Sequence, residues 1–196
     1  MSIAIIPARG GSTRIPRKNV KMFHGQPIIA YSIKTALDSG LFSRVVVSSE
    51  DLEIQQIAIK YGAGIQPRPA ELAQDEVGTQ EVMKQALIAA RNSGLTSRYA
   101  CCIYPTAPMM TTHDLVLGYQ SMIRRLSCYA FSVGTDPLQD AGQWYWGKVD
   151  AFLEDVPLID ERSIMVPIDR RRVCDINTPE DWERAELRFI TLRVGI

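Results

Sequence analysis

Glycines and cations gather in one short segment near the beginning of this chain. Gly10, Gly11 and Ser12 follow an apolar run that ends at Pro7. No acidic residue occurs before Asp38, whereas the same stretch contains Arg9, Arg14, Arg17, Lys18, Lys21 and Lys34. Glycines let a backbone approach a phosphate closely, and N–H groups and cations then neutralise its charge. The segment therefore predicts a polyanion site at the carboxyl end of a strand, where open α/β sheets bind ligands.

Two structural alternatives stay open for this loop. The glycines could form a plain turn between strand and helix, and Lys18 and Asn19 could belong to a solvated surface. The loop is not a P-loop of the Walker type, because Lys18 lies too far along and no Gly-Lys-Ser/Thr occurs. The crowding of cations favours phosphate binding over a plain turn.

The elements that position the loop alternate in type. Apolar runs predict strands at 3–6, 45–49, 99–104 and 129–133. Stripes at helical spacing predict intervening helices, carried by Ile29, Ile33, Ala36 and Leu37, by Ile54, Ile57, Ala58 and Tyr61, and by Val82, Met83, Ala86, Leu87 and Ala90, with another helix over about 112–126. This order predicts one α/β domain over 1–196, with helices on both faces of a mostly parallel sheet.

The last third of the chain is less regular. Residues 143–147 and 163–166 are typical of strands, and 173–176 is a further strand candidate. A helix start follows, because Thr178 can cap the helix, Pro179 suits its first position and Asp181 completes a capping box. Trp182, Ala185 and Phe189 supply the buried stripe of this helix.

Composition excludes several classes of function. Lys and Arg total 22 and so do Asp and Glu, which speaks against a nucleic-acid or membrane surface. No signal peptide and no membrane span is visible, so we expect a cytoplasmic protein. The cysteines Cys101, Cys102, Cys128 and Cys174 show no CxxC spacing, and buried, reduced thiols are expected. The adjacent pair should point to opposite faces of its strand.

Five motifs resemble those of one enzyme family in the same order along nearly the whole chain. They are 6–12 with 15–19, 47–51, 68–73, 104–108 and 175–182. The chain resembles the cytidylyltransferases that activate nonulosonic acids, the acylneuraminate cytidylyltransferase family. Segments 102–108 and 140–147 look most like the members that act on pseudaminic acid. The resemblance implies a three-layer αβα, Rossmann-like fold of the nucleotide-diphospho-sugar transferase type.

The implied reaction joins CTP and pseudaminic acid to give the CMP-sugar and pyrophosphate, a step of glycan biosynthesis. An enzyme for N-acetylneuraminate or another sugar is an alternative, as is a degenerate nucleotide-binding homologue without turnover. The residues do not identify a general base.

The resemblance also implies which residues form the site. Catalytic roles fall on Arg9, Lys18 and Asp175. Nucleotide contacts fall on Ala8, Arg9, Gly10, Gly11, Ser12, Lys18, Asn19, Arg68 and Thr106, and on Thr79 as the expected cap of the third helix. Sugar contacts fall on Tyr104, Asp140, Gln143 and Tyr145. Pro105–Pro108 could equally be only a strand terminator, and Arg68 an exposed turn residue.

The expected metal is Mg²⁺, bound by Asp175 and the nucleotide phosphates, with Asn177 as a weak or water-mediated ligand. The family pattern here is Asp-x-Asp at the end of a strand, and this chain has Asp175-Ile176-Asn177. Thr13 likewise replaces a usual lysine, and Glu50 a usual aspartate. Each change alters the charge or the reach of a side chain in the expected site.

The chain is short where relatives carry a segment for dimerisation and sugar binding. Only six residues separate Val133 from Asp140, so 135–167 is expected to be a reduced version of that region. The resemblance implies a homodimer, and this gap puts that state and the sugar selectivity in question.

Overall fold

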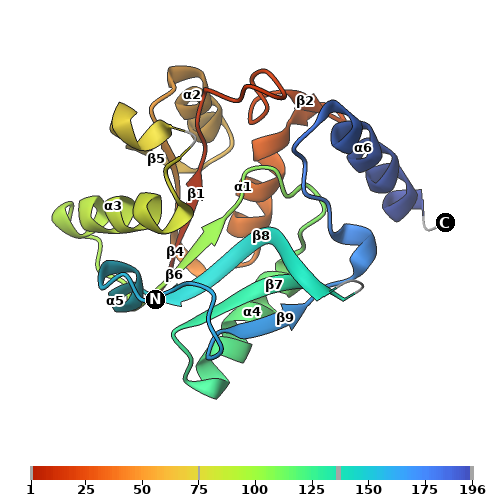
Figure 1. The fold of residues 1–196 in the computed structure, drawn as a ribbon. Helices are drawn as coiled ribbons and strands as arrows, with labels where there is room; N and C mark the ends of the chain where they lie inside the picture. The colour runs from red at the N-terminus through yellow and green to blue at the C-terminus, as the bar shows by residue number, and fades with distance from the viewer. Residues whose placement is uncertain (1, 75, 136–137, 195–196) are drawn as a thin grey trace.

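A seven-stranded sheet organises the protein in the computed structural model, which describes residues 2–74, 76–135 and 138–194 (Figure 1). The strand order is β5-β4-β1-β6-β8-β7-β9. Their bounds are β1 Ser2–Pro7, β4 Phe42–Ser49, β5 Gly64–Pro67, β6 Tyr99–Ile103, β7 Tyr129–Thr135, β8 Leu138–Lys148 and β9 Ile164–Pro167. All sheet pairings are parallel except those of β8, which runs antiparallel to β6 and β7. The mostly parallel sheet predicted from the sequence is confirmed.

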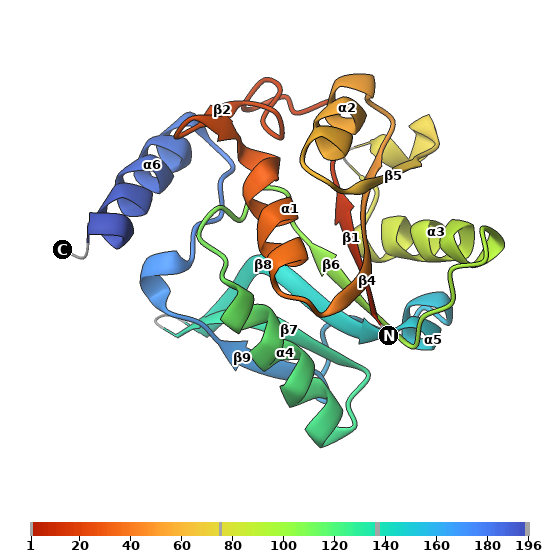
Figure 2. The same ribbon diagram turned by 180° about the vertical axis from the view of Figure 1, so that it is seen from behind.

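Helices cover both faces of this sheet, which gives the three αβα layers. The helices are α1 Ile28–Asp38, α2 Leu52–Lys60, α3 Thr79–Asn92, α4 Thr112–Arg125, α5 Val149–Leu153 and α6 Pro179–Val194. Helices α1, α2 and α4 contribute to one buried cluster, and α3 and α5 to the other. Figure 2 shows α1 and α4 in front of the sheet, and Figure 1 shows α3 and α5 on the opposite side.

The alternation of side chains along β1 and β6 feeds the two clusters. Ile6 and Cys101 belong to the cluster under α1, and Ile5 and Cys102 to the cluster under α3. Because successive strand residues point to opposite faces, both faces of a central strand must be apolar. The two adjacent cysteines are fully buried on opposite faces, as predicted, and burial raises the pKa of both thiols. Cys128 and Cys174 are free as well but only partly buried.

Helix α6 docks at the edge of the molecule through a third cluster. Trp182, Ala185 and Phe189 pack there against Phe23 and Tyr31. Phe23 belongs to the short hairpin of β2 (Met22–Phe23) and β3 (Gln26–Pro27), which the sequence analysis did not predict. The predicted capping box of this helix is confirmed by two hydrogen bonds. The Thr178 N–H donates to Asp181 Oδ2 at 2.8 Å, and the Asp181 N–H donates to Thr178 Oγ1 at 3.2 Å.

Three expectations about local structure are wrong. Residues 173–176 form no strand and instead connect the 3-10 turn Arg170–Arg172 to α6. Their carbonyls bond side chains rather than a neighbouring strand, because Lys18 Nζ and Arg188 donate to them. Leu37 is 41% exposed and lies outside the buried stripe of α1. Thr79 is the first residue of α3, and Gly78 occupies the cap position, so the Thr79 hydroxyl caps nothing.

Candidate active site

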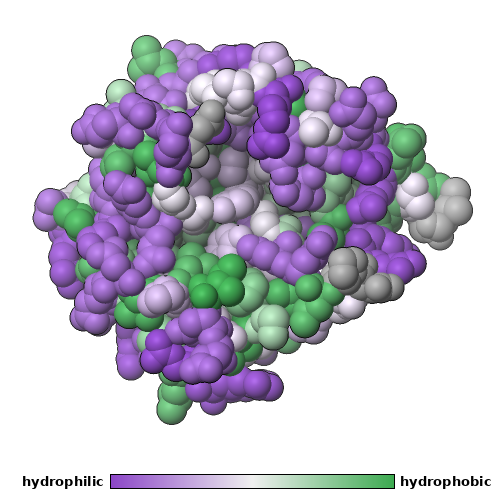
Figure 3. Space-filling model, in the orientation of Figure 1, coloured by the Kyte–Doolittle hydropathy of each residue, from purple (hydrophilic) through white to green (hydrophobic). Residues whose placement is uncertain are grey.

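A cavity of about 280 Å³ opens where β1, β5 and β6 end. Figure 3 shows a hollow in the middle of this face, surrounded mainly by hydrophilic residues. The cavity collects predicted site residues from distant parts of the sequence, and they are Arg9, Ser12, Lys18, Asn19, Arg68, Thr79, Tyr104 and Thr106. Pro7, Leu72, Gln74, Val77, Val82 and Pro105 complete its lining. Ala8, Gly10, Gly11, Asp140, Gln143, Tyr145 and Asp175 do not line it.

The glycine-rich loop offers side chains to this cavity more than backbone N–H groups. The Ala8 N–H donates to Ser48 O at 3.0 Å, and the Gly10 N–H donates to Glu50 Oε1 at 2.6 Å. The Ser12 N–H turns inward to Gly10 O at 3.1 Å. This differs from the expected backbone cradle, because protein acceptors already hold these three donors. Arg9, the Ser12 hydroxyl and Lys18 are the groups that a phosphate would meet.

The loop is fixed against the beginning of α2. A Cβ atom on Gly10 would lie 2.4 Å from Asp51 Oδ2, so no side chain fits at this position. Arg17 has a left-handed backbone (φ 56°) and its guanidinium pairs with Asp51 and Glu53, on the outer side of the loop. The acids of α2 thereby neutralise one cation of the loop. Arg9 and Lys18 line the cavity.

Lys18 connects the loop to the segment in front of α6. Its Nζ donates to Ile176 O at 2.6 Å. Burial lowers the pKa of its ammonium, and the neighbouring Asp175 acts in the opposite direction. A half-buried cation of this kind keeps little water around it, so its field acts strongly on a bound anion. The alternative that Lys18 is a solvated surface residue is wrong.

Asn19 supports the backbone of Arg9. Its side-chain Nδ2 donates to Arg9 O at 2.9 Å, and the residue is buried. Asn19 also lines the cavity, so it can both hold Arg9 in place and contact a ligand.

Arg68 is a buried cation, not the exposed turn residue of the alternative interpretation. Its side chain is only 4% exposed and its NH2 donates to Ser48 O at 3.1 Å. Glu50 Oε2 lies 3.5 Å from the same nitrogen. Burial lowers the pKa of the guanidinium, whereas Glu50 raises it. The Nε of Arg68 is buried without a hydrogen-bond partner, which leaves one donor for a ligand.

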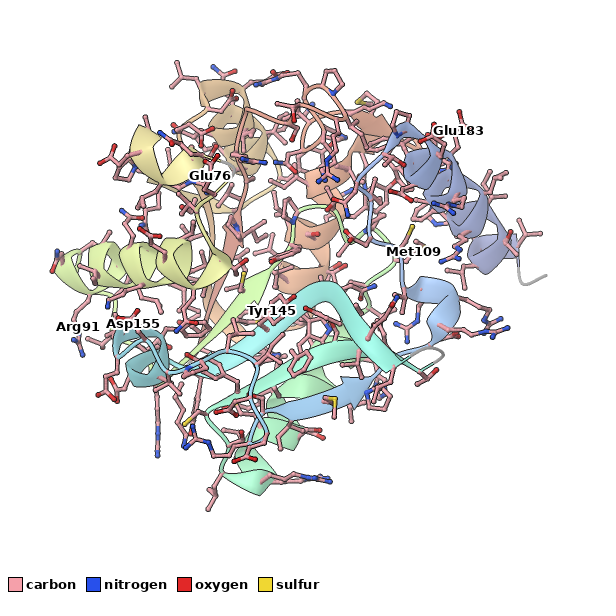
Figure 4. The ribbon with its side chains drawn as sticks, in the orientation of Figure 1. Glu76, Arg91, Met109, Tyr145, Asp155 and Glu183 are labelled. Carbon is pink, nitrogen blue, oxygen red and sulfur yellow. The ribbon has the colours of Figure 1, made fainter. Side chains whose placement is uncertain are left out.

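A row of hydroxyl groups leads from the cavity toward β8. Thr79 Oγ1 and Tyr104 Oη lie 2.6 Å apart, and the rings of Tyr104 and Tyr145 are 5.5 Å apart. The Tyr145 hydroxyl donates to Asp140, which is exposed near the start of β8. Burial raises the pKa of Tyr104 to about 12 and raises the pKa of Tyr145 further. Both tyrosines are therefore neutral hydrogen-bonding groups at physiological pH. Figure 4 shows Tyr145 in the middle of this face.

Gln143, the fourth residue expected to bind sugar, is placed differently. It is buried, its Nε2 donates to Arg172 O at 2.6 Å, and its backbone O accepts from the Tyr104 N–H at 2.8 Å. Gln143 therefore ties β8 to the end of β6.

A second cavity, of about 190 Å³, shares Arg9, Ser12 and Lys18 with the first and extends toward Asn177. Arg14 NH2 donates to Asn177 Oδ1 at 3.3 Å, and Asn177 Nδ2 donates to Asp175 Oδ2 at 2.5 Å. Asp175 and Asn177 thus face one another although their segment is not a strand. The described residues contain no group of three or more His, Cys, Asp or Glu side chains that could hold a metal ion.

The donor set around Asp175 fits a magnesium ion held mainly by substrate. Mg²⁺ is usually bound by one or two carboxylates together with phosphates and waters. Asp175 supplies one exposed carboxylate, and the amide oxygen of Asn177 is engaged by a cation. The protein therefore offers one carboxylate where the family pattern has two, and one oxygen of that carboxylate already accepts from Asn177 Nδ2.

Two contacts of the site were not expected, although both segments belong to the motifs of the sequence analysis. The 3-10 turn Ala70–Ala73 and Gln74 close one side of the cavity, and Glu50 connects the loop to Arg68. The motifs at 47–51 and 68–73 signalled that these segments matter, but not that Glu50 and Arg68 would lie beside one another.

The model of the cytidylyltransferase family matches residues 3–139 of this chain. The pseudaminic acid cytidylyltransferase of Campylobacter jejuni subsp. jejuni serotype O:2 is 33% identical over 222 aligned positions, which include 96% of each chain. Since 222 positions exceed the 196 residues present here, that relative has residues without a counterpart in this chain. The CMP-N,N'-diacetyllegionaminic acid synthase of Legionella pneumophila is 33% identical over 107 positions, covering 54% of this chain and 46% of that protein.

A solved structure agrees with the fold. The CMP:2-keto-3-deoxy-manno-octonic acid synthetase complexed with CTP superposes with a TM-score of 0.77, covering 97% of this chain and 99% of the other. Its sequence identity is 14%, so this likeness concerns the fold alone. Within the described part of the chain, no helix combines the length and apolarity needed to cross a bilayer.

Proposed function

Because the chain belongs to the cytidylyltransferase family, we propose that it transfers CMP from CTP to a nonulosonic acid and releases pyrophosphate. The sugar that we propose is pseudaminic acid. One observation carries the proposal: Arg9, Lys18 and Arg68 converge on one cavity at the carboxyl ends of parallel strands. Three cations beside a hydroxyl-lined wall suit a nucleoside triphosphate better than a neutral sugar.

The protein's task in this reaction is alignment and charge neutralisation. The anomeric hydroxyl of the sugar attacks the α-phosphorus of CTP, the bond to the β-phosphate oxygen breaks and pyrophosphate leaves. Arg9 and Lys18 neutralise the charge that builds up on the leaving group, and the Ser12 hydroxyl donates to a phosphate oxygen. Arg68, with its unpartnered Nε, contacts the cytidine.

Asp175 is the residue that would hold Mg²⁺ together with the phosphates, with Asn177 as a weaker ligand. When bound, the ion supplies further neutralisation of the triphosphate. The Asn177 oxygen is neutral and already accepts from Arg14 NH2, so it attracts a cation less than a carboxylate would. We therefore propose that magnesium binds more weakly here than in a site with two carboxylates.

Tyr104, Tyr145 and Asp140 are proposed as the sugar side of the site. Their hydroxyl and carboxylate groups extend away from the nucleotide cavity, along the antiparallel strand β8. Pseudaminic acid is favoured over N-acetylneuraminate by the relative that aligns over nearly its whole length. A homodimer in the cytoplasm belongs to the same proposal.

The test is pyrophosphate release by the purified chain with CTP and Mg²⁺, comparing pseudaminic acid with N-acetylneuraminic acid. Release with pseudaminic acid alone supports both the activity and the sugar. Release with the other sugar alone keeps the activity and corrects the substrate. Binding of CTP without release from either sugar would identify a nucleotide-binding homologue that has lost turnover.

A further inference from the structure

Glu50 lies between the glycine-rich loop and Arg68. It follows β4 directly, whereas Gly10 comes shortly after β1 and Arg68 directly after β5. These three strands are neighbours in the order β5-β4-β1 and run parallel, as the reader can follow in Figure 1. The residues that follow their carboxyl ends therefore lie in a row, and Glu50 occupies its middle.

Each oxygen of the Glu50 carboxylate faces one of its two neighbours. Oε1 accepts from the Gly10 N–H at 2.6 Å, and Oε2 lies 3.5 Å from Arg68 NH2. A hydrogen bond from a backbone N–H to a carboxylate is a strong one, so the contact with Gly10 fixes the carboxylate in place. Oε2 is buried and makes no hydrogen bond within the described part of the chain, which leaves its charge directed at the guanidinium.

This ion pair offsets the charge of Arg68 at one end of the cavity. Burial lowers the pKa of the Arg68 guanidinium, Glu50 raises it, and the nearby Arg9 lowers it further. A buried cation is stable only beside an opposite charge, and removing that partner leaves the cation uncompensated. At the loop end, Lys18 donates to the neutral carbonyl of Ile176 and not to a carboxylate. The two ends of the cavity thus differ in charge although both contain cations.

We propose that Glu50 is a positioning residue that directs Arg68 to the neutral cytosine base and confines the phosphates to the loop end of the cavity. Arg68 and Glu50 together carry no net charge, so this end attracts a triphosphate less than Lys18 does. The unpartnered Nε of Arg68 can still donate a hydrogen bond, which suits the ring carbonyl of cytosine. The inference rests on the proposed function, because it assigns the two ends of the proposed CTP site.

The experiment is calorimetric titration of the whole chain with CTP and, separately, with inorganic tripolyphosphate, which has three phosphates and no nucleoside. Glu50→Gln keeps the shape of the side chain and an acceptor for the Gly10 N–H but removes the charge. We expect it to bind CTP more weakly and tripolyphosphate at least as tightly as the wild type. The preference for CTP, taken as the ratio of the two dissociation constants, should fall at least about tenfold.

Three further variants separate the charge of Glu50 from other effects. Glu50→Asp retains the charge and should keep the preference to within about threefold of wild type. The matched control is Glu53→Gln, since Glu53 pairs with Arg17 on the outer side of the loop, and its preference should stay within about twofold. The double variant Glu50→Gln with Arg68→Gln leaves no unpaired buried charge. It should bind tripolyphosphate within about threefold of wild type, because this end is again without net charge.

Four results would overturn the inference. Equal changes in the two dissociation constants of Glu50→Gln, or no change in either, would refute the positioning role and leave the proposed function standing. An equal loss of preference in Glu53→Gln would show an effect of overall charge. A double variant that binds tripolyphosphate at least about tenfold more weakly would show that Arg68 contacts phosphates, and this holds even where Glu50→Gln alone does not fold. A wild-type chain that does not bind CTP excludes the proposed function and the inference together.

Discussion

Replacing Lys18 by Met tests the proposed leaving-group role most directly. The change keeps the length of the side chain and removes its charge. An ammonium about 4 Å from a phosphate charge is worth about 4 kcal/mol at an effective dielectric constant of about 20. Lys18 is already half-buried and oriented by Ile176 O, so most of this energy is available to the bound phosphate. About 4 kcal/mol corresponds to roughly a thousandfold in rate.

Loss of a single transition-state donor typically costs about a hundredfold to a thousandfold. We therefore expect Lys18→Met to lower kcat for pyrophosphate release by at least about a hundredfold. The matched control is Lys21→Met, since Lys21 lies over the Trp182 ring, 4.3 Å from its centroid, and outside the cavity. Its kcat should stay within about twofold of wild type.

The pH dependence gives the same assay a second readout. Burial lowers the pKa of Lys18 from its usual 10.5, so the active ammonium form is lost as pH rises, at a lower pH than for an exposed lysine. Lys18→Arg should keep activity on the alkaline side, because a guanidinium stays charged. A Lys18→Met enzyme with kcat within about threefold of wild type would refute the assignment, as the charge could then not act in the transition state.

Three further predictions concern the loop, the metal and the last helix. Gly10→Ala should weaken CTP binding about tenfold in calorimetry while melting changes little, since the new Cβ must displace the loop from Asp51. Asn177→Asp should lower the Mg²⁺ concentration for half-maximal activity, and an unchanged value would remove this position from the metal site. Burial raises the pKa of Asp181, but hydrogen bonds from the Asn177 and Thr178 N–H groups outweigh this and lower it to about 2. The cap therefore stabilises α6 above about pH 4, and this stabilisation is lost as pH falls toward 2. We expect the melting temperature of Asp181→Asn to depend less on pH below about pH 4 than that of the wild type.

Much of the fold follows from local pattern. Central strands such as β1 are apolar on both faces, which made the strand predictable. The capping residues Thr178, Pro179 and Asp181 likewise predicted the start of α6. The strand expected at 173–176 was wrong, although Val173 to Ile176 has strand-like composition. Its carbonyls are taken by Lys18 and Arg188 instead. The contact between Lys18 and Ile176 joins residues more than 150 positions apart, which no local pattern encodes.

The site, too, was only partly predictable from the sequence. The sequence showed which cations the loop contains, but not which of their side chains point into the cavity. Arg17 turns to Asp51 and Glu53, whereas Lys18, the next residue, turns into the cavity. Arg17 has a left-handed backbone and pairs with acids at the beginning of α2, so the two neighbouring side chains leave the loop on different sides. Arg68 was open to a surface interpretation until the structure buried it beside Glu50.

The direction of β8 explains how a sugar pocket can join the nucleotide site. In a parallel sheet the carboxyl ends of the strands share one edge, and only those ends can supply ligand contacts there. β8 runs the opposite way, with Tyr145 paired to Cys102 of β6, so its early residues lie at that same edge. The Tyr145 ring therefore reaches the Tyr104 ring, and Asp140, near the start of β8, accepts from the Tyr145 hydroxyl. A reversed strand can thus extend the proposed nucleotide site sideways without displacing the loop that we propose to hold the phosphates.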